Sequence, residues 1–499
     1  EKEMLGVTTF DGGILGRVTL GKRLTLVITG FACLFAVLIG NLTWHMVINA
    51  EAVQKDPYNG HTLERTSNIQ RGALLTSDGT VLARSVWDES TGRWQRTYPE
   101  GTLAAHVVGY NSPAFGAAGA ESAYADILAG QSGFGTWASA LNAFAGLKTP
   151  GNDAYLTIDS RIQAAAEQAL VGEVGGVAVL DAASGDVLAL ASAPSYDNNM
   201  VEDLLATNGD DGTGLGGGSG VLFNRATQGL YAPGSTFKTV TLASALTKGS
   251  ATLDTVYNAP GSIEIGNAPI TNFDNYAYGD VPLLKGYELS SNTVFAQVAD
   301  EIGAEQLCET AGRFGFNRSL STDFEVATSL MPEPAEMTQW ETAWAGVGQP
   351  VGEHKSPAGP QATVLQMALV GAGIANDGVV MKPHLLERVM SAEGVEVQTG
   401  AEESLGEAVS PSVASKIQQA MEGVVKEGTG TAAQISGYTV RGKTGTAQTN
   451  NPKDNSWFVG YVEVGGRNVV VAIVLEETAG GAATPKARDI LQAAIEVYE

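Results

Sequence analysis

The sequence predicts an α+β domain built on a mostly antiparallel sheet flanked by helices. A single transmembrane helix and then a small N-terminal domain are predicted to precede this domain. Three observations support this fold class. An uncharged apolar run occupies residues 24–43 near the N-terminus. Strand patterns occur at 175–196 and again at 468–475, and helical patterns lie between them. We expect four parts: a short cytoplasmic tail (1–21), a transmembrane helix (22–46), a small N-terminal domain (47–150) and a larger α+β domain (151–499).

The composition argues against several classes of protein. The chain has 499 residues with 54 Asp+Glu against 29 Lys+Arg, a formal charge of −25, so its surface repels phosphate backbones and nucleic acid is not an expected partner. Its five histidines are scattered, and its two cysteines, Cys33 and Cys308, form no metal-binding or disulfide pattern. We therefore predict neither a metal site nor a cofactor.

The apolar run at 24–43 has about the 20 residues that a helix needs to cross a bilayer. Lys22 and Arg23 precede it, which predicts a cytoplasmic N-terminus and an extracellular remainder at the plasma membrane. The alternative is a cleaved signal peptide, because Ala50-Glu51-Ala52 matches a cleavage site. The run is long for a signal peptide and the match lies well beyond its end, so we favour a single-pass anchor.

The remaining elements follow from local patterns. Residues 71–85 read as short strands around an Asp78-Gly79 turn, and Asp159 caps a helix that follows it. The segment 175–196 reads as a hairpin with Ser184-Gly185 at its turn. Three further elements are predicted: a flexible Gly-rich loop at 208–220, a buried strand at 468–475 and an amphipathic helix at 486–499.

Three short motifs occur in order along the larger domain: Ser235-Thr236-Phe237-Lys238, Ser290-Ser291-Asn292 and Lys443-Thr444-Gly445-Thr446. Each motif alone is common by chance, and a helix surface or a turn is then the simpler interpretation. Their joint occurrence in order, each in a fitting local context, favours one shared site.

The first motif has the residue types of an activated nucleophile. Pro233-Gly234 breaks the chain, a helix can begin at Ser235, and Lys238 then lies on the same helical face. A serine hydroxyl needs a base within hydrogen-bond reach, and a lysine serves only when burial or another cation lowers its pKa. Lys443 is a candidate for that second cation.

The third motif lies in a predicted strand at 438–449, whose edge suits pairing with an extended peptide. Lys443, Thr444 and Thr446 are candidates to hold a carboxylate, and the backbone N–H groups of Thr446 and Ser235 are candidates for an oxyanion hole. Residues 437–444 also match the phosphate-binding pattern G-x-x-x-x-G-K-[ST]. The sequence that follows them is unable to form the helix that such a loop requires. We take that match to be accidental.

The three motifs and their flanking sequences resemble those of class B penicillin-binding proteins, in the short form typical of actinobacteria. The resemblance covers nearly all of 151–499 and, more faintly, 71–126, which is similar to the N-terminal pedestal of that family. The resemblance rests on the sequence segments 224–238, 286–303, 313–317, 361–378, 427–449 and 456–462.

The resemblance implies a peptidoglycan D,D-transpeptidase of the serine type, acting in elongation or division. Ser235 would attack a D-Ala-D-Ala stem peptide, Lys238 would be the base, and Ser290 would relay a proton to the leaving group. The implied substrate-binding residues are Asn292, Lys443, Thr444, Gly445 and Thr446. β-Lactams would acylate Ser235, and a SEDS-family membrane glycosyltransferase would polymerise the glycan, because no such module precedes the domain.

Three alternatives remain open. A D,D-carboxypeptidase or a β-lactamase would share the same motifs, although a β-lactamase needs a water-activating carboxylate that we do not identify. A non-catalytic sensor of β-lactams or wall peptides is the third, and the three intact motifs argue against it.

Overall fold

The structure is a computed structural model that describes residues 14–43, 69–130, 150–208, 220–352, 355–449 and 453–499. The chain divides into two compact units, Glu1–Arg65 and Thr66–Glu499, which we describe separately. Most of the Gly-rich loop predicted at 208–220 lies outside the described residues, as do the tail up to residue 13 and parts of the predicted N-terminal domain.

The first unit contains one long helix, α1 (Ile14–Thr43), which includes the whole apolar run. Large apolar side chains between Leu26 and Ile39 are more than half exposed along it. In the part of the chain that the structure describes, no helix meets the combined length and hydropathy expected of a membrane span. The predicted transmembrane helix is therefore not confirmed here and stays a prediction.

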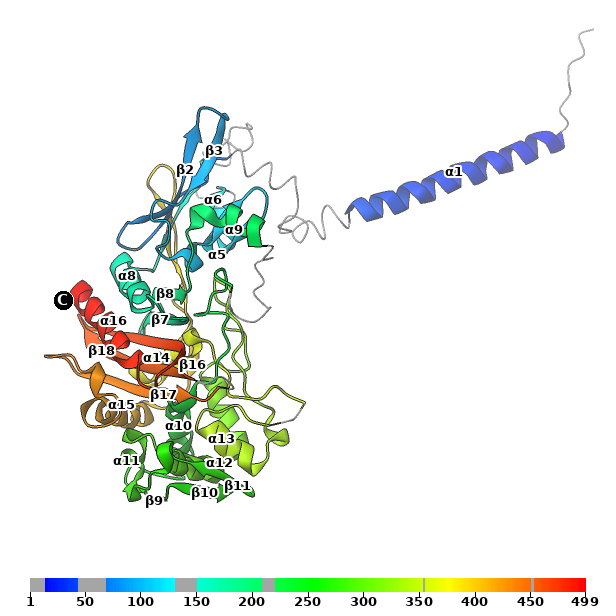
Figure 1. The fold of residues 1–499 in the computed structure, drawn as a ribbon. Helices are drawn as coiled ribbons and strands as arrows, with labels where there is room; N and C mark the ends of the chain where they lie inside the picture. Colours follow the sequence, from blue (N-terminus) through cyan, green and yellow to red (C-terminus); the bar gives the residue numbers. More distant parts are fainter. Residues whose placement is uncertain (1–13, 44–68, 131–149, 209–219, 353–354, 450–452) are drawn as a thin grey trace, which may run out of the picture. The chain divides into compact units, whose positions relative to one another are not determined.

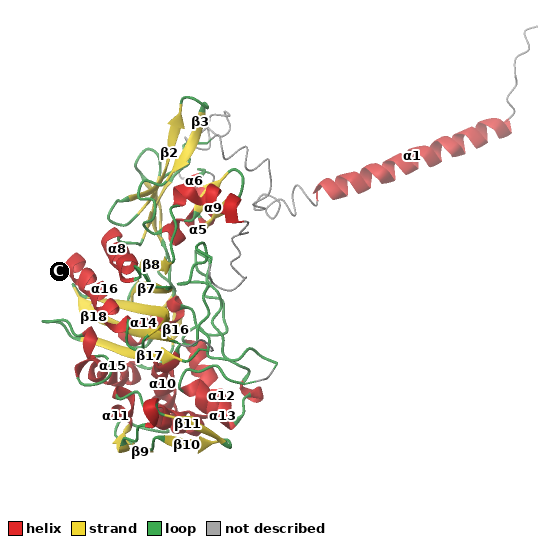
Figure 2. Cartoon of the chain, in the orientation of Figure 1, coloured by secondary structure: helices red, strands yellow, loops and turns green. Residues whose placement is uncertain are grey.

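The second unit is built around a five-stranded sheet with strand order β17-β18-β19-β7-β8, in which every neighbouring pair is antiparallel (Figures 1 and 2). The strands are β7 (Gly175–Asp181), β8 (Val187–Ala193), β17 (Val440–Ala447), β18 (Asp454–Val464) and β19 (Arg467–Thr478). The predicted hairpin is β7 and β8, with Gly185 at φ 85° in its turn, and the predicted strand at 468–475 lies within β19. These predictions are confirmed.

Helices cover both faces of this sheet. α8 (Ser160–Ala169) and α16 (Ala483–Tyr498) pack together on one face, and α14 (Val364–Ala375) packs on the other. Every residue of β7 is buried, and its side chains alternate between the two faces: Val177 and Val179 join the α8–α16 core, whereas Ala178 and Leu180 join the α14 core. The α+β fold class is thus confirmed.

The starts of α8 and α16 can be compared with the helix starts predicted from the sequence. Asp159 caps α8 as expected, because its carboxylate accepts hydrogen bonds from the N–H groups of Arg161 and Ile162. The C-terminal helix was predicted from residue 486, and α16 begins three residues earlier at Ala483. The N–H of Ala483 donates to Ser456 Oγ, so a side chain from β18 satisfies the first turn of α16.

The core that contains α14 continues into a helical lobe. Its helices are α10 (Lys238–Lys248), α11 (Leu283–Glu288), α12 (Asn292–Arg313), α13 (Gln339–Gly346) and α15 (Pro411–Lys426). α12 packs against both α10 and α13, and α15 packs against β17 (Figure 1). The three motifs lie where this lobe meets the edge strand β17.

A second sheet joins segments that are distant in sequence, with strand order β15-β14-β6-β1-β2-β3. Its strands are β1 (Leu74–Leu75), β2 (Val81–Asp88), β3 (Arg93–Thr97), β6 (Asp153–Leu156), β14 (Leu386–Met390) and β15 (Glu396–Thr399). β1 and β2 flank the predicted Asp78-Gly79 turn, where Gly79 has φ 91°. The predicted boundary at residue 150 stays a prediction. In this sheet β6 pairs with β1 of the N-terminal segment on one side and with β14 on the other.

Shorter elements complete the unit. The small strands are β4 (Tyr110–Ser112), β5 (Gly116–Ala118), β9 (Val256–Ala259), β10 (Ser262–Ile265), β11 (Ala268–Thr271), β12 (Gly279–Pro282), β13 (Val379–Met381) and β16 (Ser404–Glu407). The short helices are α4 (Ala105–Val108), α5 (Gly119–Ala123), α6 (Ala125–Leu128), α9 (Val201–Asn208), and the 3₁₀ turns η2 (Asn198–Met200), η3 (Gly234–Phe237), η4 (Phe273–Asn275), η5 (Pro334–Glu336) and η6 (Thr431–Ala433).

Candidate active site

The structure brings all three motifs together at one place. Ser235 lies in the 3₁₀ turn η3, and the α-helix α10 begins at Lys238. We expected the helix to begin at Ser235, so the helical start is three residues later than the sequence suggested. A 3₁₀ turn has three residues per turn, which still places residues 235 and 238 on one face.

Glycines allow the first and third motifs to approach closely. Gly234 has φ 53°, and a Cβ on it would lie 2.5 Å from the carbonyl oxygen of Thr446. A Cβ on Gly445 would lie 2.9 Å from Thr236 Cγ2. Any side chain at either position would therefore push η3 away from β17, which gives Gly445 a structural reason to be glycine.

Lys238 is fully buried and directed at Ser235. Its Nζ lies 3.0 Å from Ser235 Oγ, 2.7 Å from the carbonyl oxygen of Ser290 and 2.7 Å from Asn292 Oδ1. Burial, and then the positive charge of Lys443, hold the pKa of Lys238 well below its usual range. The geometry thus combines a hydroxyl with an amine that readily becomes neutral.

Ser290 lies between α11 and α12, in a backbone conformation that non-glycine residues rarely adopt. Its φ is 58°, and its N–H donates to the carbonyl oxygen of Tyr287. Its Oγ is 3.4 Å from Lys238 Nζ and accepts a hydrogen bond of 2.9 Å from Lys443 Nζ. Backbone strain of this kind persists where the surrounding contacts hold it, and here it aims the hydroxyl between two lysines.

Lys443 is the second buried lysine of the site. It lies on β17, the edge strand of the central sheet, and its Nζ also donates to the carbonyl oxygen of Thr444 at 3.0 Å. Burial lowers the pKa of Lys443 to about 7. Thr444 and Thr446 follow on the same strand with half-buried side chains.

The amide of Asn292 is held at both ends. Its Oδ1 accepts the hydrogen bond from Lys238, and its Nδ2 donates to the carbonyl oxygen of Thr271 at 2.8 Å. Ser291, the middle residue of the motif, caps α12 by accepting from the N–H of Val294. The second motif therefore supplies both a helix cap and two side chains that face Lys238.

One residue of the site was missed when the motifs were identified. Thr429 lies between α15 and η6, and its hydroxyl is 2.6 Å from the hydroxyl of Thr444. Gly428 lets the chain before Thr429 pass close to α11, because a Cβ there would lie 2.5 Å from the carbonyl oxygen of Glu288. The run Glu427-Gly-Thr-Gly-Thr431 carried the resemblance, but only the fold shows that it reaches the third motif.

The phosphate-loop pattern at 437–444 is an accident, as the sequence indicated. Most of the pattern forms the first half of β17, which continues to Ala447, and no helix follows Lys443-Thr444 there. A phosphate-binding loop requires a helix start at that point.

Comparison with known proteins gives the same family from two directions. The model of the penicillin binding protein transpeptidase domain matches residues 175–492, and that of the penicillin binding protein A dimerisation domain matches 71–154. The peptidoglycan D,D-transpeptidase PbpA of Mycobacterium tuberculosis is 30% identical over 491 residues, covering 93% of this chain and 96% of the relative. PbpA of Mycolicibacterium smegmatis is 29% identical, covering 95% of this chain and 99% of the relative.

Solved structures agree. The D,D-transpeptidase domain of a peptidoglycan glycosyltransferase from Eggerthella lenta superposes with a TM-score of 0.78 at 45% identity, over 86% of this chain and 99% of that one. Penicillin-binding protein A of M. tuberculosis, as its imipenem acyl-enzyme complex, superposes with a TM-score of 0.77 at 29% identity, over 87% of this chain and 100% of that one. Because the transpeptidase model matches more than half of the chain and a 30% identical relative is covered almost completely, this chain belongs to the penicillin-binding protein transpeptidase family.

Proposed function

We propose that this chain is a peptidoglycan D,D-transpeptidase that cross-links stem peptides through an acyl-enzyme on Ser235 and is covalently inhibited by β-lactams. One observation carries the proposal: a fully buried lysine amine with a lowered pKa lies 3.0 Å from the Ser235 hydroxyl. The names of the relatives, which are peptidoglycan D,D-transpeptidases and β-lactam acyl-enzymes, point to the same reaction.

The hydrogen-bond partners of Lys238 support its role as the base. A neutral amine has two N–H donors and one lone pair. The carbonyl oxygen of Ser290 and Oδ1 of Asn292 can only accept, and each is 2.7 Å from Nζ. Both N–H groups are therefore used on these two oxygens, and the lone pair is left for the Ser235 O–H. The arrangement favours proton transfer from Ser235 to Lys238.

In the acylation step, Ser235 Oγ bonds to the carbonyl carbon of the penultimate D-Ala while its proton passes to Lys238. The carbonyl becomes an oxyanion, for which the N–H groups of Ser235 and Thr446 are the proposed donors. The bond from that carbon to the nitrogen of the terminal D-Ala then breaks, and the leaving nitrogen takes the proton from Lys238 through Ser290. The 3.4 Å and 2.9 Å contacts of Ser290 Oγ with the two lysines support this relay.

Binding of the substrate is assigned to the remaining motif residues. Lys443, Thr444 and Thr446 would hold the terminal carboxylate, with Gly445 allowing the close approach of β17 to η3. The hydroxyls of Thr429 and Thr444 share one hydrogen bond at 2.6 Å, which leaves one O–H of the pair to donate to that carboxylate. Asn292 would contact the substrate amide from the side of its Nδ2 group.

The second half of the reaction regenerates the serine. An acceptor amine attacks the ester carbon, the ester C–O bond breaks, and the amine gives up one proton that returns to Ser235 Oγ through Lys238. A β-lactam presents its ring amide to Ser235 in the same way, but its leaving nitrogen stays attached to the acyl group, so the adduct persists.

We also propose a membrane anchor and a partner. The uncharged run at 24–43, with Lys22 and Arg23 before it, and the exposed apolar side chains along α1 suit a single-pass helix with a cytoplasmic N-terminus and an extracellular catalytic domain. The segment 47–150 would be a pedestal between the two. Glycan polymerisation is assigned to a SEDS-family glycosyltransferase, and polymerisation of lipid II by the purified chain alone would contradict that assignment.

The proposed activity is tested by incubating the full-length chain with a D-Ala-D-Ala stem peptide and an acceptor amine. We expect a cross-linked product together with released D-Ala, and neither product with Ser235→Ala. Release of D-Ala without cross-links would identify a carboxypeptidase, and rapid turnover of penicillin a β-lactamase. A stable penicillin adduct combined with full rescue of wall synthesis by Ser235→Ala would identify a sensor.

A further inference from the structure

We propose that Asn272, at the end of β11, is a positioning residue that holds the Asn292 amide with its oxygen toward Lys238. The proposal rests on the function proposed for Lys238, and it concerns a residue outside the three motifs. Asn272 does not contact Ser235 or Lys238 through any described hydrogen bond, so it would act through its neighbours in sequence and in space.

The side chain of Asn272 has its hydrogen-bonding capacity filled. It is only 4% exposed, and its Oδ1 accepts from Ser291 Oγ and from the N–H of Thr293, both at 3.1 Å. Its Nδ2 donates to the carbonyl oxygens of Pro260 at 3.0 Å and Tyr276 at 2.9 Å. One amide therefore ties the strand end and the loop after it to the residues on either side of Asn292.

The orientation of Asn292 depends on the residue before Asn272. The carbonyl oxygen of Thr271 can only accept, and it takes the hydrogen bond from Asn292 Nδ2 at 2.8 Å. If the Asn292 amide were flipped, its oxygen would face the Thr271 oxygen and its NH₂ group would face the N–H groups of Lys238. Both contacts would be repulsive, so the position of Thr271 decides which end of the amide meets the base.

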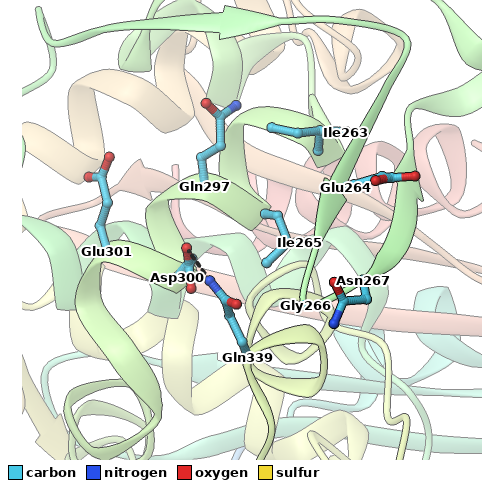
Figure 3. A pocket seen from close by; sticks show the side chains of 9 residues that line it. All are labelled: Ile263, Glu264, Ile265, Gly266, Asn267, Gln297, Asp300, Glu301 and Gln339. Carbon is cyan, nitrogen blue, oxygen red and sulfur yellow. Dashed lines mark hydrogen bonds between the residues drawn. The ribbon is translucent and has the colours of Figure 1, made fainter.

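The backbone of the β10–β11 hairpin fixes part of this position, because Thr271 pairs with Ser262 and the N–H of Asn272 donates to the carbonyl oxygen of Gly261 at 3.0 Å. Ile270 anchors the middle of β11 in the core. At the other end of the hairpin, the turn at Gly266 lines a pocket of about 430 Å³, which Gln297 and Asp300 of α12 also line (Figure 3). The Phe273 side chain that follows Asn272 is 79% exposed. The polar contacts of the Asn272 side chain thus add to the backbone pairing in holding the Thr271 carbonyl against the second motif.

The test separates acylation from binding in the full-length protein. Stopped-flow reaction with a fluorescent penicillin gives the acylation constant k2 and the dissociation constant Ks for wild type, Asn272→Ala, Asn292→Ala and the double variant. We expect Asn272→Ala to lower k2 by about tenfold with Ks within about twofold, since a misplaced partner weakens proton transfer more than binding. The double variant should be no slower than Asn292→Ala, because Asn272 acts through Asn292.

Independent, additive losses in the double variant would overturn the proposal, as would a change confined to Ks. Asn198→Ala is the matched control: Asn198 lies outside the three motifs, is also 4% exposed and donates to the carbonyl oxygens of Ala105 and Gly109. It should lower thermal stability and leave k2 unchanged.

A second variant, Asn272→Asp, tests the same contacts with a smaller structural change in case Asn272→Ala does not fold. Asn272→Asp keeps the oxygen that accepts from Ser291 and Thr293 but loses both donors, so its k2 should fall between those of wild type and Asn272→Ala. The outcomes also separate the two proposals. If the wild-type protein is not acylated on Ser235, the proposed function is contradicted. If the wild type is acylated normally but the losses of k2 in the two single variants add in the double variant, only the role of Asn272 is contradicted.

Discussion

Lys443 Nζ donates a 2.9 Å hydrogen bond to Ser290 Oγ, the same hydroxyl that lies 3.4 Å from Lys238 Nζ. Two buried amines therefore share one serine, and each disfavours the protonated form of the other. Since protons leave such a pair in coupled steps, the site is expected to carry fewer positive charges at neutral pH than two ordinary lysines would. This coupling makes the pH dependence of acylation the first property to measure.

Removing the charge of Lys443 should move that pH dependence in a definite direction. The positive charge of Lys443 lowers the pKa of Lys238, so Lys443→Ala should raise it and shift the acidic limb of the acylation profile to higher pH. The rate of penicillin acylation measured from pH 5 to pH 9 checks this. Lys416→Ala, an exposed lysine on α15, is the control and should keep the wild-type profile; an unshifted limb in Lys443→Ala would refute the coupling.

Gly234 should be intolerant of a side chain because of what it touches. Gly234→Ala would place a Cβ 2.5 Å from the carbonyl oxygen of Thr446, so we expect at least a tenfold loss of acylation rate as η3 moves from β17. Gly249 also has a positive φ, of 72°, with nothing within 4 Å of an added Cβ. Gly249→Ala should lose about 1 kcal/mol of stability from backbone strain alone and keep its acylation rate. Equal effects of the two variants on acylation would contradict the contact.

The hydroxyl of Thr429 is expected to contribute to carboxylate binding. Thr429→Val removes the O–H that pairs with Thr444 but keeps the shape, and we expect Ks for benzylpenicillin to rise about fivefold to tenfold. Thr429→Ser restores a hydroxyl and should restore Ks. The methyl ester of benzylpenicillin lacks the carboxylate charge, so its weaker binding should be insensitive to Thr429→Val; equal loss for both ligands would assign Thr429 a purely structural role.

Stability should also depend on pH through Lys443. Its pKa is lowered from 10.5 to about 7 in the folded protein, so the unfolded chain binds more protons between these values. The free energy of unfolding therefore rises with pH between about 7 and 10.5, at most by about 1.4 kcal/mol per pH unit from this one residue. Lys443→Met removes that contribution, and urea unfolding at pH 7 and pH 9 should show a smaller rise than wild type. An equal or steeper rise in the variant would argue against a buried, neutral Lys443.

Much of this site was accessible from sequence because its chemistry is encoded in short, ordered motifs. The spacing of Ser235 and Lys238 predicted their contact, and the alternating pattern around Lys443 predicted its strand. The hairpin β7–β8 and the strand β19 followed from apolar patterns that are long and regular enough to identify.

Other features depend on contacts that no local pattern contains. Ser290 adopts a left-handed conformation between α11 and α12, and serine has no intrinsic preference for that conformation that a sequence pattern would reveal. Thr429 and Asn272 reach the site only because α15 and the β10–β11 hairpin fold back on it. The pairing of β6 with β14 joins segments more than two hundred residues apart, and β1 pairs with the other side of β6, so the six-stranded sheet was predicted only in part.

The mass of the intact protein after incubation with a penicillin, followed by peptide mapping of the adduct, tests the central claim most directly. We predict a stable mass increase equal to one whole penicillin molecule, located on Ser235 within the peptide that contains Lys238, and no increase for Ser235→Ala. An adduct on another residue, or none under conditions where the protein is folded, would contradict the assignment of Ser235 as the nucleophile.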